Sequence, residues 1–398
     1  MVWVESLDLQ ILRRVGNIPT APFFEEKICT EAQRIVQKLF PSGHKHKVSP
    51  FKDEFGNFFV HYSGDHNRTH PKVLAYVVHM DHPAFHVSYD NNNNRYVATL
   101  MGGLNTDLLP HNVPILLHGQ GESARGRLTE AVPDDEKKYV IDTEERGEFQ
   151  FATLDLPPLE VRQSYISGPA LDDLASIGMS LAALKQISAQ HLDVDVYVIL
   201  HRAEEVGFIG AYGVASRGIF PKEAMVVSVE TSSYLAKRDR KDPSCPVDRI
   251  VEPGRGIVIR TGDNITPAFN VETLHVLREG ALRAQQEEVV VQQQRMYGGS
   301  CEAALYHAFG YRAAGMCIPL FAWHNNGVLE GETNFKSEVV HIDDFHGGTK
   351  VLVQMAQVAS DRPELYRTLG RADITPDQLQ LVESVRKEFE KYRKMRLI

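Results

Sequence analysis

Apolar residues recur along the chain with two different periods, which predict helices alternating with strands. Helical spacing occurs near the start, around Leu7–Leu12 and again around Ile28–Leu39. Continuous apolar runs of strand length follow, and such runs are typical of strands that are buried on both faces of a sheet. The clearest runs are Val73–Val78, Val194–Leu200 and Met225–Val229. This alternation favours a three-layer α/β/α sandwich around a mixed sheet.

The rest of the chain continues the alternation, apart from one interruption. Further helices are expected at Leu174–Ile187, Gly210–Ser216, Thr273–Gln286, Ala303–Phe309 and Asp344–Ala359. Further strands are expected at Phe55–Val60, Gly256–Arg260, Val289–Val291 and Ala313–Ile318.

The interruption lies at residues 86–160, where short β-like pieces alternate with turn signals and no long helical period occurs. This pattern of short strands and turns predicts a small all-β domain inserted into the α/β domain. The chain then divides into a first part of the main domain at 1–85, the β insertion at 86–160, a second part of the main domain at 161–360 and a charged helical tail at 361–398.

Composition and charge narrow the class of protein without identifying it. The 398 residues include 43 basic and 52 acidic side chains, and the net charge of −9 gives no signal for nucleic-acid binding. No stretch approaches the roughly 20 apolar residues that a membrane helix needs. The start of the chain lacks the features of a signal peptide, and the cysteines form no paired motif, so we expect a cytoplasmic protein. The four cysteines are Cys29, Cys245, Cys301 and Cys317.

Polar residues that could bind metal stand at the ends of predicted strands, where open α/β sheets build their sites. Each has an ordinary structural alternative. A histidine at a strand end is more often structural, an Asp pair before a helix can cap that helix, and adjacent acids can form a surface turn. In chain order the candidates are His79, Asp81, Asp172, Asp173, Glu204, Glu205, Glu230 and His324.

Taken together, these residues suit a metal centre better than any of them does alone. Carboxylates mixed with imidazoles suit zinc, cobalt or manganese, and a pair of ions can hold both the attacking and the leaving oxygen. Asp81 could orient His79, because a metal-binding imidazole usually gives its other nitrogen to an oxygen. One of Glu204 and Glu205 could bind metal while the other takes a proton from water.

The order of these residues resembles the co-catalytic zinc aminopeptidases, most closely the glutamyl or tetrahedral aminopeptidase family. His79–Asp81 resembles that family's strand end, and Ala170–Asp173 resembles its helix start. Glu204–Ala211 resembles its E-E-V-G-x-x-G-A segment, and Gly298–Ala303 stands where the family has G-G-T-D-A. The β insertion also falls where the family inserts a small β domain.

The resemblance implies a dinuclear metallo-aminopeptidase that cleaves N-terminal residues from short peptides. The two ions would be zinc, although cobalt and manganese also suit these ligands. Glu204 would be the general base, with Asp81 as a further catalytic residue. The metal ligands would be His79 and Glu230 for one ion, Glu205 and His324 for the other, and Asp172 as a bridge between both. A homo-oligomer, often a dodecamer, and a cis peptide bond after Asp172 are implied as well.

The sequence departs from the family pattern beside several of these residues. Glu230 stands where relatives usually have Asp, and His82 stands where they usually have Glu. Ser300–Glu302 replaces T-D, which leaves the role of that loop open. Asn325–Gly327 follows His324 where the family has S-P, and an apparent insertion then precedes Glu338. Two later histidines, His341 and His346, are therefore rival candidates for the last ligand, although they adjoin the closing helix.

Two other functions fit part of this pattern. A related metallohydrolase, such as a deacylase or carboxypeptidase, shares the acid–histidine set. The β insertion favours an aminopeptidase over deacylases, which typically insert a helix-containing dimerisation domain. An inactive binding or assembly homologue would also keep the fold, but the intact Glu204 argues against it.

Overall fold

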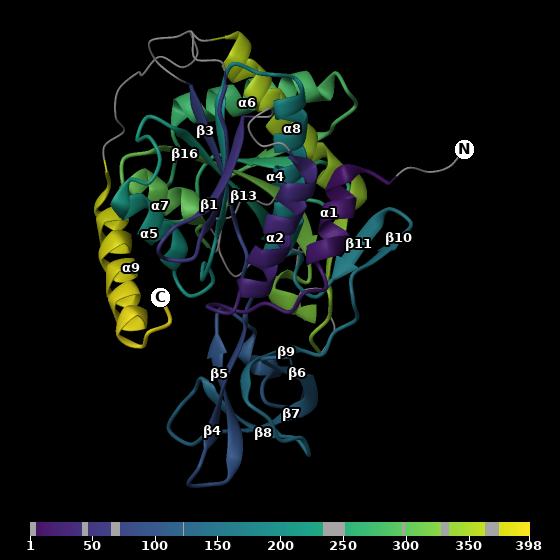
Figure 1. Ribbon diagram of the computed structural model, residues 1–398, viewed down its shortest axis with the longest axis vertical. Coiled ribbons are helices and arrows are strands. Elements are labelled where there is room, and N and C mark those ends of the chain that lie inside the picture. The colour runs from purple at the N-terminus through teal and green to yellow at the C-terminus, as the bar shows by residue number, and fades with distance from the viewer. Residues whose placement is uncertain are drawn as a thin grey trace.

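The structure is a computed structural model, and it describes residues 5–41, 47–64, 72–121, 123–233, 251–296, 299–327, 334–362 and 374–398. These ranges form a large α/β domain with a small β-barrel attached at one end (Figure 1). The predicted fold class, a mixed sheet covered by helices with an all-β insertion, is therefore confirmed. Within the described ranges, no helix is long and apolar enough to cross a membrane.

One mixed sheet, with 11 strands among the described residues, forms the centre of the α/β domain. Its strands are β1 (Val48–Lys52), β2 (Phe58–Tyr62), β3 (Val73–His79), β10 (Glu160–Arg162), β11 (Tyr165–Gly168), β12 (Asp195–His201), β13 (Met225–Ser233), β14 (Ile257–Arg260), β15 (Val291–Gln294), β16 (Arg312–Phe321) and β17 (Glu338–His341). Strands β12, β3, β13 and β16 are parallel neighbours, and the main path of the sheet extends from them through antiparallel strands on both sides. Every residue of β3 is buried, as expected for a strand with helices on both faces.

Helices cover both faces of this sheet. They are α1 (Leu7–Val15), α2 (Glu26–Leu39), α4 (Leu171–Ala189), α5 (Ile209–Arg217), α6 (Val271–Gln285), α7 (Glu302–Ala308), α8 (Ile342–Asp361) and α9 (Pro376–Lys394). Helices α1, α4, α6 and α8 pack together on one face, and α5 and α7 lie on the other with α9 outside them (Figure 1). Helix α4 is buried on nearly all sides, which explains why its sequence is apolar all round.

The inserted barrel has its own hydrophobic core. Its strands are β4 (Ala84–Asp90), β5 (Arg95–Met101), β6 (Val113–Gly119), β7 (Ser123–Ala131), β8 (Lys138–Asp142) and β9 (Phe149–Leu154). They close in the order β4-β5-β8-β7-β6-β9, with side chains such as Phe85, Ile115 and Leu128 buried inside. Closure pairs the edge strands that an open sheet would leave exposed.

A few elements differ from the sequence prediction. Strand β1 was not expected, because four of its five residues are exposed and it shows no alternation. Strand β13 continues past Val229 to Ser233, since its pairing with β16 extends to Leu320. The short strand expected at Val289–Val291 begins only at Val291. The domain boundaries at 85, 160 and 360 stay predictions, and Cys245, Gly298 and residues 363–373 of the tail lie outside the described residues.

Candidate metal centre

The parallel strands bring the predicted ligands to one edge of the sheet. His79 is the last residue of β3, and Glu230 lies near the carboxyl end of β13. Glu205 follows β12, and His324 follows β16. Because parallel neighbours end at the same edge, their terminal side chains converge there, as in other open α/β sheets. Asp172 joins them from the first turn of α4.

Two groups of donor atoms meet at Asp172. One group contains His79, Asp172 and Glu230, and the other contains Asp172, Glu205 and His324, with the donor atoms of each group within 4.8 Å of one another. Nε2 of His79 lies 3.4 Å from Oδ1 of Asp172 and 3.7 Å from Oε2 of Glu230. Nε2 of His324 lies 3.3 Å from Oε1 of Glu205 and 3.7 Å from Oδ2 of Asp172. The two oxygens of Asp172 therefore face different histidines.

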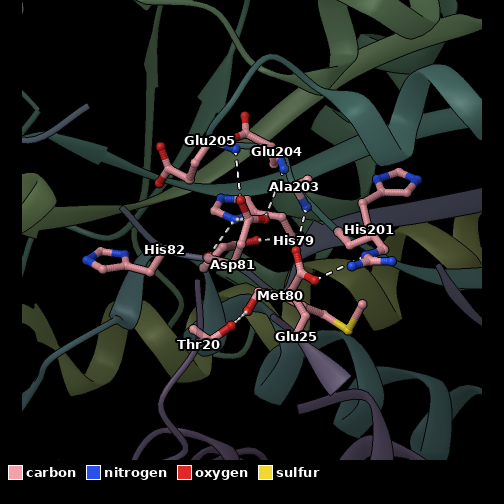
Figure 2. Close-up of polar contacts among 12 residues, drawn as sticks. Thr20, Glu25, His79, Met80, Asp81, His82, His201, Ala203, Glu204 and Glu205 are labelled. Atoms are coloured by element: carbon pink, nitrogen blue, oxygen red, sulfur yellow. Dashed lines mark hydrogen bonds and ion pairs between the residues drawn. The ribbon is translucent and has the colours of Figure 1, made fainter. Parts of the chain in front are cut away.

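Glu204 lies beside both groups, on a turn that Asp81 holds. Oδ1 of Asp81 accepts the backbone N–H of Glu204, and Oδ2 accepts that of Glu205, each at 3.0 Å (Figure 2). The sequence suggests that Asp81 orients His79. The backbone oxygen of Asp81 does lie 3.1 Å from Nδ1 of His79. The carboxylate is farther away, at 3.6 Å. Its hydrogen bonds to the turn were not foreseen.

The shared Asp172 is held from several directions. Its backbone N–H donates to Oε2 of Glu338 at 2.9 Å, and Oε1 of the same Glu338 accepts the backbone N–H of His324 at 2.9 Å. The Asp172–Asp173 peptide bond is cis, as the resemblance implies. Asp173 is fully buried, and its Oδ2 accepts the backbone N–H of His79 at 3.2 Å. One buried carboxylate, Glu338, thus ties together the backbones of two candidate ligands.

The pKa shifts of the side chains show how closely the acids are packed. Desolvation raises the pKa of Glu204 well above its usual value, and the charges of Glu230 and Glu205 raise it further. Burial likewise raises the pKa of Glu230 to about 7, although His79 opposes this. Burial alone would lower the pKa of His79, but Glu204 and other acids raise it well above its usual value. These acids cannot all be ionised together without a compensating positive charge.

In the second donor group, burial and neighbouring charges again shift the pKa values in opposite directions. Burial would lower the pKa of His324, but Glu205 and Asp172 raise it to about 9. Burial would raise the pKa of Asp172, yet the contacts with His79 and His324 bring it below its usual range. Oδ1 of Asp172 and Oε1 of Glu205 are buried without a hydrogen-bond donor. Divalent cations would satisfy these oxygens and neutralise the excess charge, so the side chains present fit a two-metal site.

Comparison with known proteins identifies the family to which this fold and these residues belong. The family model for M42 glutamyl aminopeptidases matches residues 142–346. The chain belongs to the M42 glutamyl aminopeptidase family. A search of curated proteins gives no match.

Solved structures show the same fold at low sequence identity. An aminopeptidase from the archaeon Desulfurococcus kamchatkensis has a TM-score of 0.71 at 19% identity, covering 92% of this chain and 99% of that one. A TET aminopeptidase from a marine sediment thaumarchaeon has a TM-score of 0.69 at 16% identity, covering 95% and 98%. The TET1 peptidase of Pyrococcus horikoshii has a TM-score of 0.67 at 17% identity, covering 88% and 99%.

The two rival histidines of this M42 chain lie outside both donor groups. The His341 side chain accepts the backbone N–H of Asp343 and caps α8, and Nδ1 of His346 meets Oδ2 of Asp8 at 3.0 Å. His82 makes two polar contacts beside the centre. Its Nδ1 lies 2.6 Å from the backbone oxygen of Asp172, and its Nε2 lies 3.0 Å from Oδ1 of Asn325.

Several residues that shape the centre were not identified from the sequence. Glu338 holds two ligand backbones, and the backbone oxygen of Gly103, from the β insertion, lies 2.6 Å from Nδ1 of His324. Glu25 accepts the backbone N–H of Ala203 at 2.8 Å, just before the Glu204 turn (Figure 2). Trp323 donates to Asp172. These residues lie far apart in sequence and belong to no motif, so only the folded chain reveals them.

Proposed function

We propose that this protein is a two-metal aminopeptidase that removes N-terminal residues from short peptides. One observation carries the proposal: two buried donor groups share the carboxylate of Asp172, and a further glutamate, Glu204, lies beside them. Membership of the glutamyl aminopeptidase family supports the reaction class. The inserted β-barrel supports it against deacylases, which typically carry a different insertion.

Each residue would have a distinct role in this reaction. His79 and Glu230 would hold one ion, Glu205 and His324 the other, with Asp172 shared between them. When bound, the ions supply Lewis-acid chemistry that polarises the peptide carbonyl and makes water easier to deprotonate. Zinc suits the ligands best, and cobalt or manganese would also fit.

Glu204 would move the proton in the reaction. Its carboxylate would take a proton from the attacking water and later release it to the leaving amine. The peptide C–N bond breaks, the water oxygen stays on the new carboxyl group, and both water protons are accounted for in the products. Asp81 would keep Glu204 in place through the backbone hydrogen bond to its turn.

The proposal is tested by measuring metal content and cleavage together. Purified protein is assayed for metal per chain and for hydrolysis of peptides with free or blocked N-termini. About two ions per chain, with cleavage of free-amine peptides only, is the expected result. Cleavage of blocked substrates would instead assign a deacylase or carboxypeptidase. Absence of bound metal and of turnover, even after addition of zinc, cobalt or manganese, would leave an inactive homologue.

We also propose that the chain forms a homo-oligomer. The Pyrococcus horikoshii TET1 peptidase can assemble into a tetrahedron or a large octahedral shell, and another TET1 structure is a dodecamer. Light scattering on the full chain would test this, and a monomeric mass would reject it. A cytoplasmic location, without nucleic-acid or membrane partners, stays a prediction from the sequence.

A further inference from the structure

The side chain of Trp323 contacts two candidate ligands of the same donor group. Its indole N–H donates to Oδ2 of Asp172 at 3.0 Å. The same ring stacks on the imidazole of His324, with centroids 3.7 Å apart and planes inclined by 25°. Oδ2 is also the oxygen of Asp172 that faces Nε2 of His324. One indole thus restrains the shared carboxylate and a neighbouring imidazole together.

The local backbone presents Trp323 in this position. The chain leaves β16 through Ala322, in a left-handed conformation with φ of 54°, and His324 adopts a similar φ of 52°. Such values are uncommon for residues other than glycine and need support from their surroundings. Glu338 supplies support by accepting the backbone N–H groups of both His324 and Asp172. The loop is therefore attached to Asp172 through its backbone and through the indole.

Among the described residues, the indole makes no hydrogen bond or ring stack to His79 or Glu230, the two ligands that belong only to the other donor group. Oδ1 of Asp172 faces His79, whose Nδ1 lies near the backbone oxygen of Asp81. His79 and Glu230 also stand on central strands of the sheet, where pairing with neighbouring strands restrains the backbone. The described contacts of the indole are thus confined to the side of Asp172 that faces Glu205 and His324.

We propose that Trp323 is a positioning residue for one of two metal positions, the one formed by Asp172, Glu205 and His324. This inference rests on the proposed two-metal function. The indole N–H holds Oδ2 of Asp172, the oxygen that faces His324, and the stacked ring fixes the plane of the His324 imidazole. Hydrogen bonds to ligating carboxylates typically affect metal affinity by about 10–100-fold. Removing the N–H therefore weakens this position more than the His79–Glu230 position, which the indole reaches only through the shared Asp172.

Calorimetric titration of metal-stripped protein with Zn²⁺ tests the proposal. Trp323→Phe keeps an aromatic ring but lacks the N–H, and Trp3→Phe makes the same change at the only other tryptophan of the chain. We expect two binding steps in the natural protein and in Trp3→Phe. In Trp323→Phe one step should weaken about 10–100-fold while the other weakens much less. Equal weakening of both steps, or no change in either, would overturn the proposal.

A double substitution identifies which position is affected. Glu205→Gln removes a ligand from the same position, so the step that remains belongs to the His79–Glu230 position. Adding Trp323→Phe to Glu205→Gln should lower the remaining affinity far less than Trp323→Phe alone lowers the affected step, because the two substitutions act mainly on one position. A further large loss of Zn²⁺ affinity in the double variant would show that Trp323 supports the His79–Glu230 position, and this would reject the inference.

Two further readouts separate this inference from the proposed function and from misfolding. If the natural protein binds no Zn²⁺, the proposed function fails, and the inference with it. If the natural protein binds two ions and Trp323→Phe binds them identically, only the inference fails. If Trp323→Phe does not fold, the emission of Trp323 in the Trp3→Phe variant decides. It should change more with one Zn²⁺ equivalent than with the other, and an emission that stays unchanged or changes equally with both would overturn the inference.

Discussion

Two buried clusters of acids and histidines lie on neighbouring strands, yet only one of them suits a metal. His79 and His201 are register partners at the ends of β3 and β12. His201 pairs with Glu302, whose Oε1 lies 2.7 Å from Nδ1, and its Nε2 lies 2.9 Å from the hydroxyl of Tyr306. In Figure 2 its ring points away from Glu205. We refer to His201, Glu302 and Tyr306 as the closed cluster.

The two clusters differ in how charge is balanced. In the closed cluster one carboxylate faces one imidazole, whose other nitrogen meets a tyrosine. Burial raises the pKa of Tyr306 well above its usual value, so its hydroxyl stays protonated and can donate. At the candidate metal centre four acids surround two histidines. Burial and residue type are alike in the two clusters, and the excess of acid over base distinguishes the site that needs a cation.

The same substitution in each cluster gives the sharpest test of this contrast. Glu204→Gln should lower turnover by about 10²–10⁴-fold, because general-base catalysis contributes that much and an amide cannot accept the proton. Both metal ions should remain, since Glu204 is not among the proposed ligands. Peptide hydrolysis and metal content of the same preparation check the prediction.

Glu302→Gln is the matched control. It also converts a glutamate to its amide near the centre, but in the closed cluster, and its effect on turnover should be far smaller. Equal losses of turnover in Glu204→Gln and Glu302→Gln would contradict the claim that only the metal centre takes part in catalysis. If Glu204→Gln turned over peptide as fast as the unsubstituted protein, Glu204 could not be the general base.

Asp172→Asn should remove the feature that makes the centre a two-metal site. An amide offers one neutral oxygen in place of two charged ones, so both ions should bind more weakly. The loss should exceed the roughly 10–100-fold typical of residues that only support ligands. Asp173→Asn, beside it, should keep both ions, because the Asp173 carboxyl accepts a backbone N–H rather than facing a histidine. Two tightly bound ions in Asp172→Asn would contradict the shared-ligand arrangement.

Glu302→Gln should affect stability rather than metal binding. The substitution replaces one carboxylate oxygen of the buried Glu302–His201 pair by an NH₂ group, and leaving a buried polar partner poorly matched costs about 1–3 kcal/mol. The thermal midpoint of the metal-free protein should therefore fall, while Zn²⁺ affinity stays close to that of the natural protein. A large loss of Zn²⁺ affinity with an unchanged midpoint would show that Glu302 belongs functionally to the centre.

The sequence could predict one cluster and not the other for a physical reason. His79, Glu205, Glu230 and His324 stand where predicted strands end, and parallel strands bring such positions together whatever the loops between them do. Asp172 could be added because it starts a helix in a recognisable segment. Glu302 lies about a hundred residues from His201, and Trp323 and Glu338 act through contacts that depend on loop conformation. Period and spacing carry no information about such contacts.

Tyr306→Phe should have the smallest effect, and it isolates the closed cluster. The substitution removes only the hydroxyl that meets Nε2 of His201, so it should cost about 1 kcal/mol, the usual contribution of one hydrogen bond. The fall in thermal midpoint should be similar in metal-free and metal-loaded protein, because bound ions stabilise both variants equally when affinity is unchanged. Tyr311→Phe is a suitable control, since Tyr311 packs edge-on against Tyr306 and its hydroxyl bonds outside the cluster. A midpoint shift in Tyr306→Phe that grows on metal loading would mean that the hydroxyl supports the metal centre, and the two clusters would then act as one.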